Sequence, residues 1–228
     1  MSEEYRFVGR TFAEYRWMFA LEVQDVTRGS VLDCPGGPSS FAAIASSWGG
    51  SVTAVDPLYT RSVAALDARC DAAVERTVTQ LAEDPELFVW DLYEDVETRG
   101  RYLRAAYERF LADYAHHPDR YVAAALPDLP FTSDSFALVL SANFLFLYDD
   151  RLDRDFHAAA FRELARVASE EVRVFTLASL DRKRSSYVDP VTETLRGGGL
   201  AVEFEAVPYG FQPGATEILV VSDCARVR

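Results

Sequence analysis

Lysine, cysteine and histidine are all scarce in this sequence. Lysine occurs once, at Lys183, among 23 basic side chains, and the 228 residues include only three cysteines and three histidines. With 36 acidic residues the formal net charge is −13, which argues against broad electrostatic binding to nucleic acid or anionic lipid, because both need a basic surface. The cysteines, Cys34, Cys70 and Cys224, are widely spaced and form no Cys-x-x-Cys pair, so we predict neither a disulfide framework nor a metal site.

Long apolar runs and a basic leader are also missing. No apolar run approaches the ~20 residues that a membrane-spanning helix needs, and residues 1–4 are acidic where a secretory leader would be basic. We therefore expect a cytoplasmic protein with reduced thiols and no membrane contact. The content of 49% hydrophobic and 26% charged residues is ordinary for a folded globular chain.

The first part of the chain alternates between helical and strand-like patterns. Residues 11–24 place apolar side chains on one helical stripe, and residues 30–34 and 51–55 have the composition of short buried strands. Residues 41–48, between those strands, are predicted to form a short helix that stops at Gly49-Gly50. This is a strand, turn, helix, strand unit.

The second half continues the alternation and then departs from it. Strands are predicted at 136–140 and 172–177, with an amphipathic helix between them. Two strand-like runs, 200–207 and 217–222, are joined without a helix and therefore pair most simply as antiparallel neighbours. The pattern predicts an α/β fold, a mostly parallel sheet with helices on both faces.

The turn after the first strand is the first candidate ligand site. In a doubly wound sheet the ligand lies beyond the carboxyl ends of the strands, where the first turn needs glycine and an acid at the end of the second strand binds a ribose hydroxyl. Gly36, Gly37 and Asp56 satisfy this demand, and Asp56 follows Gly37 by 19 residues, close to the ~20 expected. A turn with a purely structural role is the alternative. A Gly-x-Gly-x-x-Gly stretch is absent, which disfavours a pyrophosphate site and with it a nicotinamide oxidoreductase.

Two stretches resemble a known family. Residues 31–39 have the sequence Val-Leu-Asp-Cys-Pro-Gly-Gly-Pro-Ser, and residues 129–136 have the sequence Leu-Pro-Phe-Thr-Ser-Asp-Ser-Phe. The first resembles the Val-Leu-Asp-x-Gly-x-Gly-x-Gly motif of class I S-adenosylmethionine-dependent methyltransferases, with Pro35 and Ser39 in place of two glycines. The second is similar to the family's Leu-Pro-Phe-x-x-x-Ser-Phe stretch before strand four, and residues 161–167 are similar to the helix that follows that strand. The resemblance implies a doubly wound, seven-stranded sheet whose last strand is antiparallel.

The resemblance also implies S-adenosylmethionine as the cofactor. By position, Asp33 and the backbone at Gly36 and Gly37 would flank its methionine part. Asp56 would bind the ribose hydroxyls, and Leu58 would cover the adenine.

Further along the chain the resemblance assigns two more places. The acid that usually bonds the adenine amino group falls at Ala125, and Asp128 is the nearest carboxylate that can substitute. Ser141 and Asn143 end the fourth strand beside the transferring methyl, although Asn143 serves equally well as a turn-stabilising residue. The full set of expected cofactor-binding residues is Asp33, Pro35, Gly36, Gly37, Ser39, Asp56, Pro57, Leu58, Asp128, Leu129, Ser141 and Asn143.

No catalytic residue is predicted. Methyl transfer from a sulfonium needs mainly the alignment of nucleophile and methyl, and a base is needed only when the acceptor must lose a proton. The three histidines, His116, His117 and His157, are better explained as structural or exposed residues.

The segment 57–120 is longer than a single crossover helix and carries two amphipathic stripes. We expect a helical insertion that leaves the sheet beside the cofactor and covers the acceptor pocket. Candidate acceptor-binding residues are Tyr15, Trp90, Tyr93, Tyr107 and Tyr114, and the alternative is that these aromatics hold the helices together. Residues 82–97 hold seven acids and no base, which indicates either a mouth that attracts cations or, preferably, a solvated face.

Residues 1–29 are expected to form a second, N-terminal helical lid. Arg10 or Tyr15 within it is a candidate partner of the cofactor carboxylate, although a surface arginine and a core tyrosine are equally good explanations. The chain is thus predicted to be one methyltransferase-like domain, 1–228, that methylates a small molecule. A non-catalytic cofactor-binding or interaction protein is the alternative, and the oligomeric state stays open.

Overall fold

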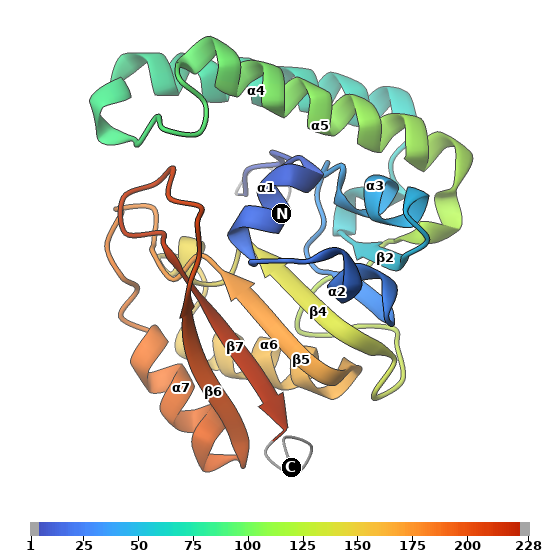
Figure 1. The fold of residues 1–228 in the computed structure, drawn as a ribbon, viewed down its shortest axis with the longest axis vertical. Helices are drawn as coiled ribbons and strands as arrows, with labels where there is room; N and C mark the ends of the chain where they lie inside the picture. The colour runs from blue at the N-terminus through green and yellow to red at the C-terminus, as the bar shows by residue number, and fades with distance from the viewer. Residues whose placement is uncertain (1–4, 224–228) are drawn as a thin grey trace.

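The computed structural model describes residues 5–223, and within that range seven strands form one sheet in the order β3-β2-β1-β4-β5-β7-β6. The strands are β1 (Ser30–Asp33), β2 (Ser51–Val55), β3 (Tyr121–Val122), β4 (Phe136–Ala142), β5 (Ala168–Phe175), β6 (Leu200–Ala206) and β7 (Glu217–Asp223). Strands β1 to β5 pair in parallel, and β7 runs antiparallel to both β5 and β6. The predicted α/β class, the seven-stranded sheet and its reversed last strand are confirmed (Figure 1).

Helices cover both faces of the sheet. They are α1 (Phe12–Met18), α2 (Val23–Thr27), α3 (Phe41–Ser47), α4 (Val63–Glu83), α5 (Val96–His116), α6 (Arg154–Val167) and α7 (Val188–Gly197), with 3-10 turns η1 (Pro57–Thr60), η2 (Pro85–Leu87), η3 (Pro118–Arg120) and η4 (Phe146–Tyr148). Helices α6 and α7 share one apolar cluster with the side chains of β4 and β5, and α1 and α3 belong to a second cluster. The doubly wound arrangement follows from these two separate cores.

The prediction of one helical stripe over residues 11–24 is wrong, because two separate helices form there. Helix α1 ends at Met18, Ala20 adopts a left-handed φ of 49°, and α2 begins at Val23. Each helix has its own capping box, at Thr11 and Glu22, so each start satisfies its own free amide groups. The apolar spacing continues across the break because α1 and α2 bury their faces against the same side of the sheet.

Helices α4 and α5 form an antiparallel pair that lies across the carboxyl ends of β1, β2 and β4 (Figure 1). The helices approach closely where Gly100 faces Val78, because a Cβ at Gly100 would lie 3.1 Å from Val78 Cγ2. An ion pair between Arg104 and Asp71 joins them further along, with Nη1 2.7 Å from Oδ1. Both helices belong to the segment that the sequence analysis expected to be an insertion.

The loop between β6 and β7 reaches the connection between α4 and α5. The amide of Val89 donates to the carbonyl of Phe211 at 2.9 Å, and the rings of Phe88 and Phe211 stack with centroids 5.0 Å apart. These contacts close one side of the space between the helical pair and the sheet.

The remaining observations concern the cysteines, membrane-spanning helices and metal ligands. Cys34 and Cys70 are buried free thiols, whereas Cys224 lies outside the described residues. No helix in residues 5–223 is long and apolar enough to cross a membrane, and no cluster of potential metal ligands occurs in the same range.

Candidate functional site

A cavity of about 790 Å³ lies between the carboxyl ends of the parallel strands and the helical pair. The turns after β1, β2 and β4 supply its floor through Gly36, Asp56 and Asn143. Helix α4 and the segment before α1 form its upper wall, and the β6–β7 loop closes one side. The cavity therefore occupies the position at which doubly wound sheets bind ligands.

The turn after β1 is held tightly to the neighbouring strands. The amide of Gly36 donates to the carbonyl of Val55 at 2.8 Å, and a Cβ at Gly36 would lie 2.8 Å from the hydroxyl of Tyr59. Gly37 has a φ of +53°, and a Cβ there would meet open space. The Tyr59 hydroxyl donates to the Gly37 carbonyl at 2.7 Å. One glycine thus permits close packing behind the turn, and the other presents bare backbone to the cavity.

Asp56 follows β2 and faces the same cavity. Its Oδ1 accepts a hydrogen bond from the Leu58 amide at 2.9 Å, which fixes the carboxyl group across the start of η1. Burial raises the pKa of Asp56 to about 6, and hydrogen bonds from the backbone of Leu58 and Gly37 and the charge of Arg69 oppose that rise. A carboxylate held in this way can accept hydrogen bonds from two neighbouring hydroxyls of a ribose.

Asp33 lies behind the cavity wall. It is buried, and the hydroxyl of Tyr15, which itself lines the cavity, donates to its carboxyl group. Burial raises the pKa of Asp33 to about 8, and the Tyr15 hydrogen bond offsets part of that rise. Tyr15 therefore stands between Asp33 and any ligand.

Most of the predicted cofactor-binding residues meet at the cavity. Those on its wall are Pro35, Gly36, Gly37, Ser39, Asp56, Pro57, Leu58 and Asn143. Asp33, Asp128, Leu129 and Ser141 do not line it. Asp128 is exposed, Leu129 donates its amide to Glu163, and Ser141 is buried within β4.

Of the predicted acceptor-binding residues, Tyr15 lines the cavity, whereas Trp90, Tyr93, Tyr107 and Tyr114 do not. Each of these four makes a hydrogen bond within the protein. Trp90 donates to the Pro85 carbonyl, Tyr107 to Asp71, Tyr114 to the Tyr59 carbonyl and Tyr93 to Glu14. Their placement matches the alternative in which these aromatics hold the helical segment together.

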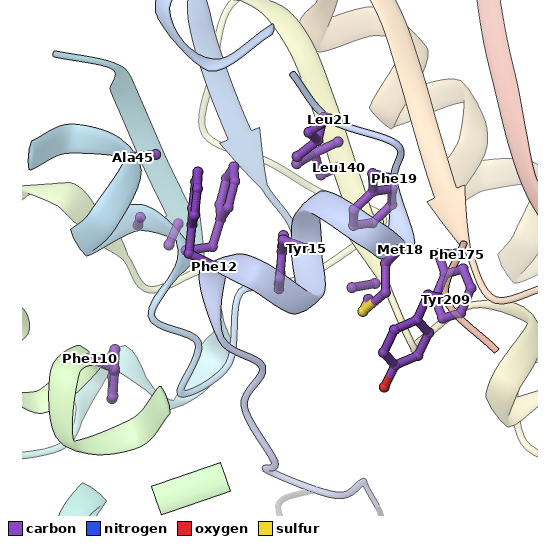
Figure 2. Close-up of a cluster of buried hydrophobic side chains, with 14 of the residues drawn as sticks. Phe12, Tyr15, Met18, Phe19, Leu21, Ala45, Phe110, Leu140, Phe175 and Tyr209 are labelled. Carbon is purple, nitrogen blue, oxygen red and sulfur yellow. The ribbon is translucent and has the colours of Figure 1, made fainter. Parts of the chain in front are cut away.

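The β6–β7 loop contributes cavity residues that the sequence pattern did not indicate. Tyr209 and Phe211 line the cavity, and Tyr209 packs edge-on against Phe175 with its hydroxyl directed away from that ring (Figure 2). The two aromatics stand in a proline- and glycine-rich loop without regular structure, and loops of this kind often carry binding residues. Phe88 and Phe144 complete the apolar wall.

A buried charged network adjoins the cavity. The carboxylate of Glu14 accepts from the Tyr93 hydroxyl at 2.6 Å and from Arg99 Nη1 at 3.0 Å, and its Oε1 lies 3.6 Å from Arg10 Nε. The hydroxyls of Tyr93 and Tyr209 lie 2.9 Å apart. Burial would raise the pKa of Glu14, but the two guanidinium charges and the Tyr93 hydrogen bond outweigh it and hold that pKa below its usual range. Glu14, in α1, therefore contacts α5 through Arg99 and the α4–α5 connection through Tyr93, whose hydroxyl lies next to Tyr209 of the β6–β7 loop.

The residues of the turn suit the cofactor that the sequence implies. Bare backbone at Gly37 and the carboxyl of Asp56 would hold the nucleoside, with Leu58 and Leu126 on the wall beside it. Arg10 lies against the turn, since its carbonyl accepts from the Ser39 hydroxyl and the Ser40 amide. Its guanidinium donates to the Gly9 carbonyl at 3.0 Å and lies 3.6 Å from Glu14 Oε1, so its charge is compensated within the protein.

No family model matches the chain. An uncharacterised protein of Methanocaldococcus jannaschii is 28% identical over 215 residues, which cover 94% of each chain. The crystal structure of 1,6-didemethyltoxoflavin-N1-methyltransferase from Burkholderia thailandensis, with 1,6-didemethyltoxoflavin and S-adenosylhomocysteine bound, has a TM-score of 0.50 and 14% identity, covering 92% of this chain and 76% of that one. The magnesium protoporphyrin IX methyltransferase of Synechocystis PCC 6803 with bound S-adenosylmethionine has a TM-score of 0.44 and 11% identity, covering 85% and 69%. The strand order 3-2-1-4-5-7-6 and the similarity to the Burkholderia structure show that the chain has the fold of the class I S-adenosylmethionine-dependent methyltransferases.

Proposed function

We propose that this protein transfers a methyl group from S-adenosylmethionine to a small molecule held beneath α4 and α5. The observation that carries the proposal is the position of Asp56, whose carboxyl group faces the same cavity as the bare backbone of Gly37. Glycine after the first strand and an acid after the second are what a nucleoside needs in a doubly wound sheet.

The chain's own part in such a reaction is to bind, orient and exclude water. A bound cofactor supplies an already activated methyl group, so the protein has mainly to place an acceptor in line with it. Asn143 follows β4 at the cavity floor and has a left-handed φ of 50°. Phe144 and Phe175 exclude water beside it. No side chain is assigned as a general base.

The size and cover of the cavity support a small acceptor. About 790 Å³ falls in the range of sites that enclose small molecules and cofactors. Residues 57–120 and the segment before α1 cover it, and we propose that both act as lids. The Burkholderia enzyme with the same fold contains a small acceptor, 1,6-didemethyltoxoflavin, together with S-adenosylhomocysteine.

Calorimetric titration with S-adenosylhomocysteine tests cofactor binding. We expect saturable binding to the native chain and affinity at least about tenfold weaker in Asp56→Ala, because the variant cannot accept hydrogen bonds from the ribose. Asp119→Ala, which removes an exposed carboxylate from η3, is the matched control and should bind normally. Absence of binding to the native chain, or undiminished binding to Asp56→Ala, would contradict the proposal.

A second measurement separates an enzyme from a cofactor-binding protein. The protein is incubated with S-adenosylmethionine labelled in its methyl group and with a fractionated extract of small molecules. Label transferred into at least one low-mass fraction, and not by Asp56→Ala, is the expected result. Tight cofactor binding without transfer to any fraction would favour the non-catalytic alternative.

A further inference from the structure

We propose that the acceptor is an anion whose carboxylate, sulfonate or phosphate group is bound by three arginines at the entrance of the cavity. These residues, Arg6, Arg69 and Arg182, are called the arginine mouth. The word acceptor rests on the proposed function, whereas the anion preference of the cavity does not.

The cavity wall is basic although the protein is acidic. The charged residues that line it are the arginines Arg6, Arg10, Arg61, Arg69, Arg99 and Arg182 and the acids Asp56, Glu83 and Asp84. Arg10 and Arg99 are ion-paired with the buried Glu14, so the other four arginines face three carboxylates in a chain with a formal net charge of −13. One of those carboxylates, Asp56, is assigned to the ribose. With Asp56 engaged by a ribose, the remaining arginines of the wall favour an anionic ligand.

A second hollow continues the cavity past the mouth and extends the positive charge. It shares Arg6, Arg69, Tyr148 and Leu180 with the main cavity and adds Arg76 and Arg151. None of the described residues on its wall is an aspartate or a glutamate. Arg151 is paired with Asp150, which leaves Arg6, Arg69 and Arg76 as the cations of this wall, and a negatively charged molecule would be drawn toward them.

Glu83 and Asp84, the other two acids of the wall, are too distant to neutralise Arg69. Glu83 ends α4 and Asp84 follows it, whereas Arg69 lies 15 positions before Asp84. At a rise of ~1.5 Å per residue, the helix places about 22 Å between the two ends of this wall. This separation exceeds the ~10 Å screening length at 0.1 M salt. Glu83 and Asp84 therefore leave the charge of Arg69 in place, and Asp56 is the carboxylate of the wall whose pKa that charge lowers.

The backbone around the mouth is fixed by the fold. The amide of Arg6 donates to the Tyr148 hydroxyl at 3.0 Å, and the amide of Arg182, in a left-handed φ of 65°, donates to the Ser179 carbonyl. Arg69 stands over the Phe7 ring, with Cζ 5.8 Å from its centroid. Neither Arg6 nor Arg182 has an ion-pair partner within the part of the chain that the structure describes. Their charges are therefore available to a ligand.

Apolar side chains line the way from the mouth to Asn143. They are Phe144, Leu147, Leu152 and Phe156, and the rings of Phe144 and Tyr148 meet edge to face at 6.2 Å. Arg10 lies beside the glycine turn, where its carbonyl accepts from the Ser39 hydroxyl, and its guanidinium is paired with Glu14. The acceptor class that this arrangement fits has an apolar, aromatic-sized body, a reactive end at Asn143 and an anionic group at the mouth.

A matched pair of fluorescent probes tests the charge preference. 8-Anilinonaphthalene-1-sulfonate and N-phenyl-1-naphthylamine have the same aromatic body and differ by one sulfonate. Each is titrated into the native chain with saturating S-adenosylhomocysteine and again without it. We expect the sulfonate to bind at least about tenfold more tightly than the neutral probe, and we expect only the sulfonate to lose affinity as salt is raised.

Substitution of the arginines tests whether the arginine mouth binds the sulfonate. Arg6→Gln and Arg182→Gln should each weaken sulfonate binding several-fold, and the two together about tenfold or more, with unchanged affinity for the neutral probe and for S-adenosylhomocysteine. Arg109→Gln, on the exposed face of α5 and away from both hollows, is the control and should bind both probes normally. Circular dichroism checks that each variant is folded.

Three outcomes would overturn the inference: equal affinity for the two probes, no binding of the sulfonate, or a sulfonate preference that survives the double substitution. Loss of S-adenosylhomocysteine binding alone would contradict the proposed function and leave the anion preference standing.

Discussion

The hydroxyl of Tyr15 donates a hydrogen bond to the buried carboxyl group of Asp33, with Oη 2.9 Å from Oδ1 and 3.1 Å from Oδ2. Tyr15 comes from α1 and Asp33 ends β1, so the contact ties the N-terminal segment to the first turn of the cavity. The Tyr15 ring also stacks on Phe41, with centroids 4.6 Å apart. The Tyr15 side chain therefore connects α1 to α3 and to the sheet.

Removing that hydroxyl should destabilise the fold. Tyr15→Phe leaves the Asp33 carboxyl without its donor in a buried place, at an expected cost of about 1–3 kcal/mol in the free energy of unfolding. It should also raise the pKa of Asp33 further, because the hydrogen bond now lowers it. Urea denaturation measures the first effect, with Tyr187→Phe as a control whose ring is half-buried and whose hydroxyl has no hydrogen bond among the described residues. Equal stability of both variants would contradict the assigned role.

The stability of the protein should fall as the pH rises, through Asp33. Its pKa is about 8 in the folded chain against 3.8 for an ordinary aspartate, so the folded state holds the extra proton between those values. The free energy of unfolding therefore decreases with pH from about 4 to 8, by a few kcal/mol from this group. Asp33→Asn removes the effect. Denaturation midpoints of the variant and the native chain should be similar at pH 5. At pH 8 the midpoint of the variant should be the higher of the two.

Binding of S-adenosylhomocysteine should require an ionised Asp56. Burial raises the pKa of that group to about 6, and only the carboxylate accepts two hydroxyl hydrogen bonds. The affinity is thus expected to rise between pH 5 and 7 and to level off above it, with a limiting slope of about tenfold per pH unit below the pKa. Calorimetry of Asp56→Asn should give weaker binding with a flat profile over that window. A native profile as flat as that of the variant would show that Asp56 does not meet the ligand.

The two glycines of the turn should respond differently to alanine. At Gly36 a Cβ would lie 2.8 Å from Tyr59 Oη, 3.0 Å from Ala54 Cβ and 3.3 Å from Asp33 Oδ2, so Gly36→Ala should cost about 1–3 kcal/mol through overpacking. At Gly37 the added group meets no atom and only the left-handed φ is strained, at about 1 kcal/mol. Gly37→Ala should instead weaken S-adenosylhomocysteine binding, because its methyl group enters the cavity. Thermal unfolding and calorimetry on the pair separate the two effects, and identical changes in both variants would refute this reading of the turn.

Glu14 should be a large contributor to stability. Glu14→Gln leaves the buried guanidinium of Arg99 uncompensated, and about 3–5 kcal/mol should be lost. Glu14→Gln combined with Arg99→Met removes the stranded charge and should recover part of that loss. The control is Glu97→Gln, whose exposed pair with Arg101 should contribute less than about 0.5 kcal/mol in chemical denaturation. A loss at Glu14 as small as that at Glu97 would be the contradicting result.

The sequence by itself determined the sheet and the place of the turn. Buried strands have continuous apolar composition, and glycine with a following acid at a distance of 19 residues marks the first crossover, so β1, α3, β2, Gly36, Gly37 and Asp56 were all visible locally. The antiparallel end of the sheet followed from two strands with no helix between them. These features depend on neighbours in the chain, and local patterns encode them well.

Tertiary structure decided which side chains meet at the cavity. Apolar periodicity continued through the break at Ala20, because α1 and α2 bury against one face, so the pattern alone did not reveal two helices. The aromatics of residues 90–114 had a composition that suits a pocket, yet Tyr93 turned to Glu14, 79 positions away in the chain. Tyr209, Arg99 and Arg182 reached the cavity from separate elements. Contacts between distant segments are set by packing and charge pairing in three dimensions, and no local spacing records them.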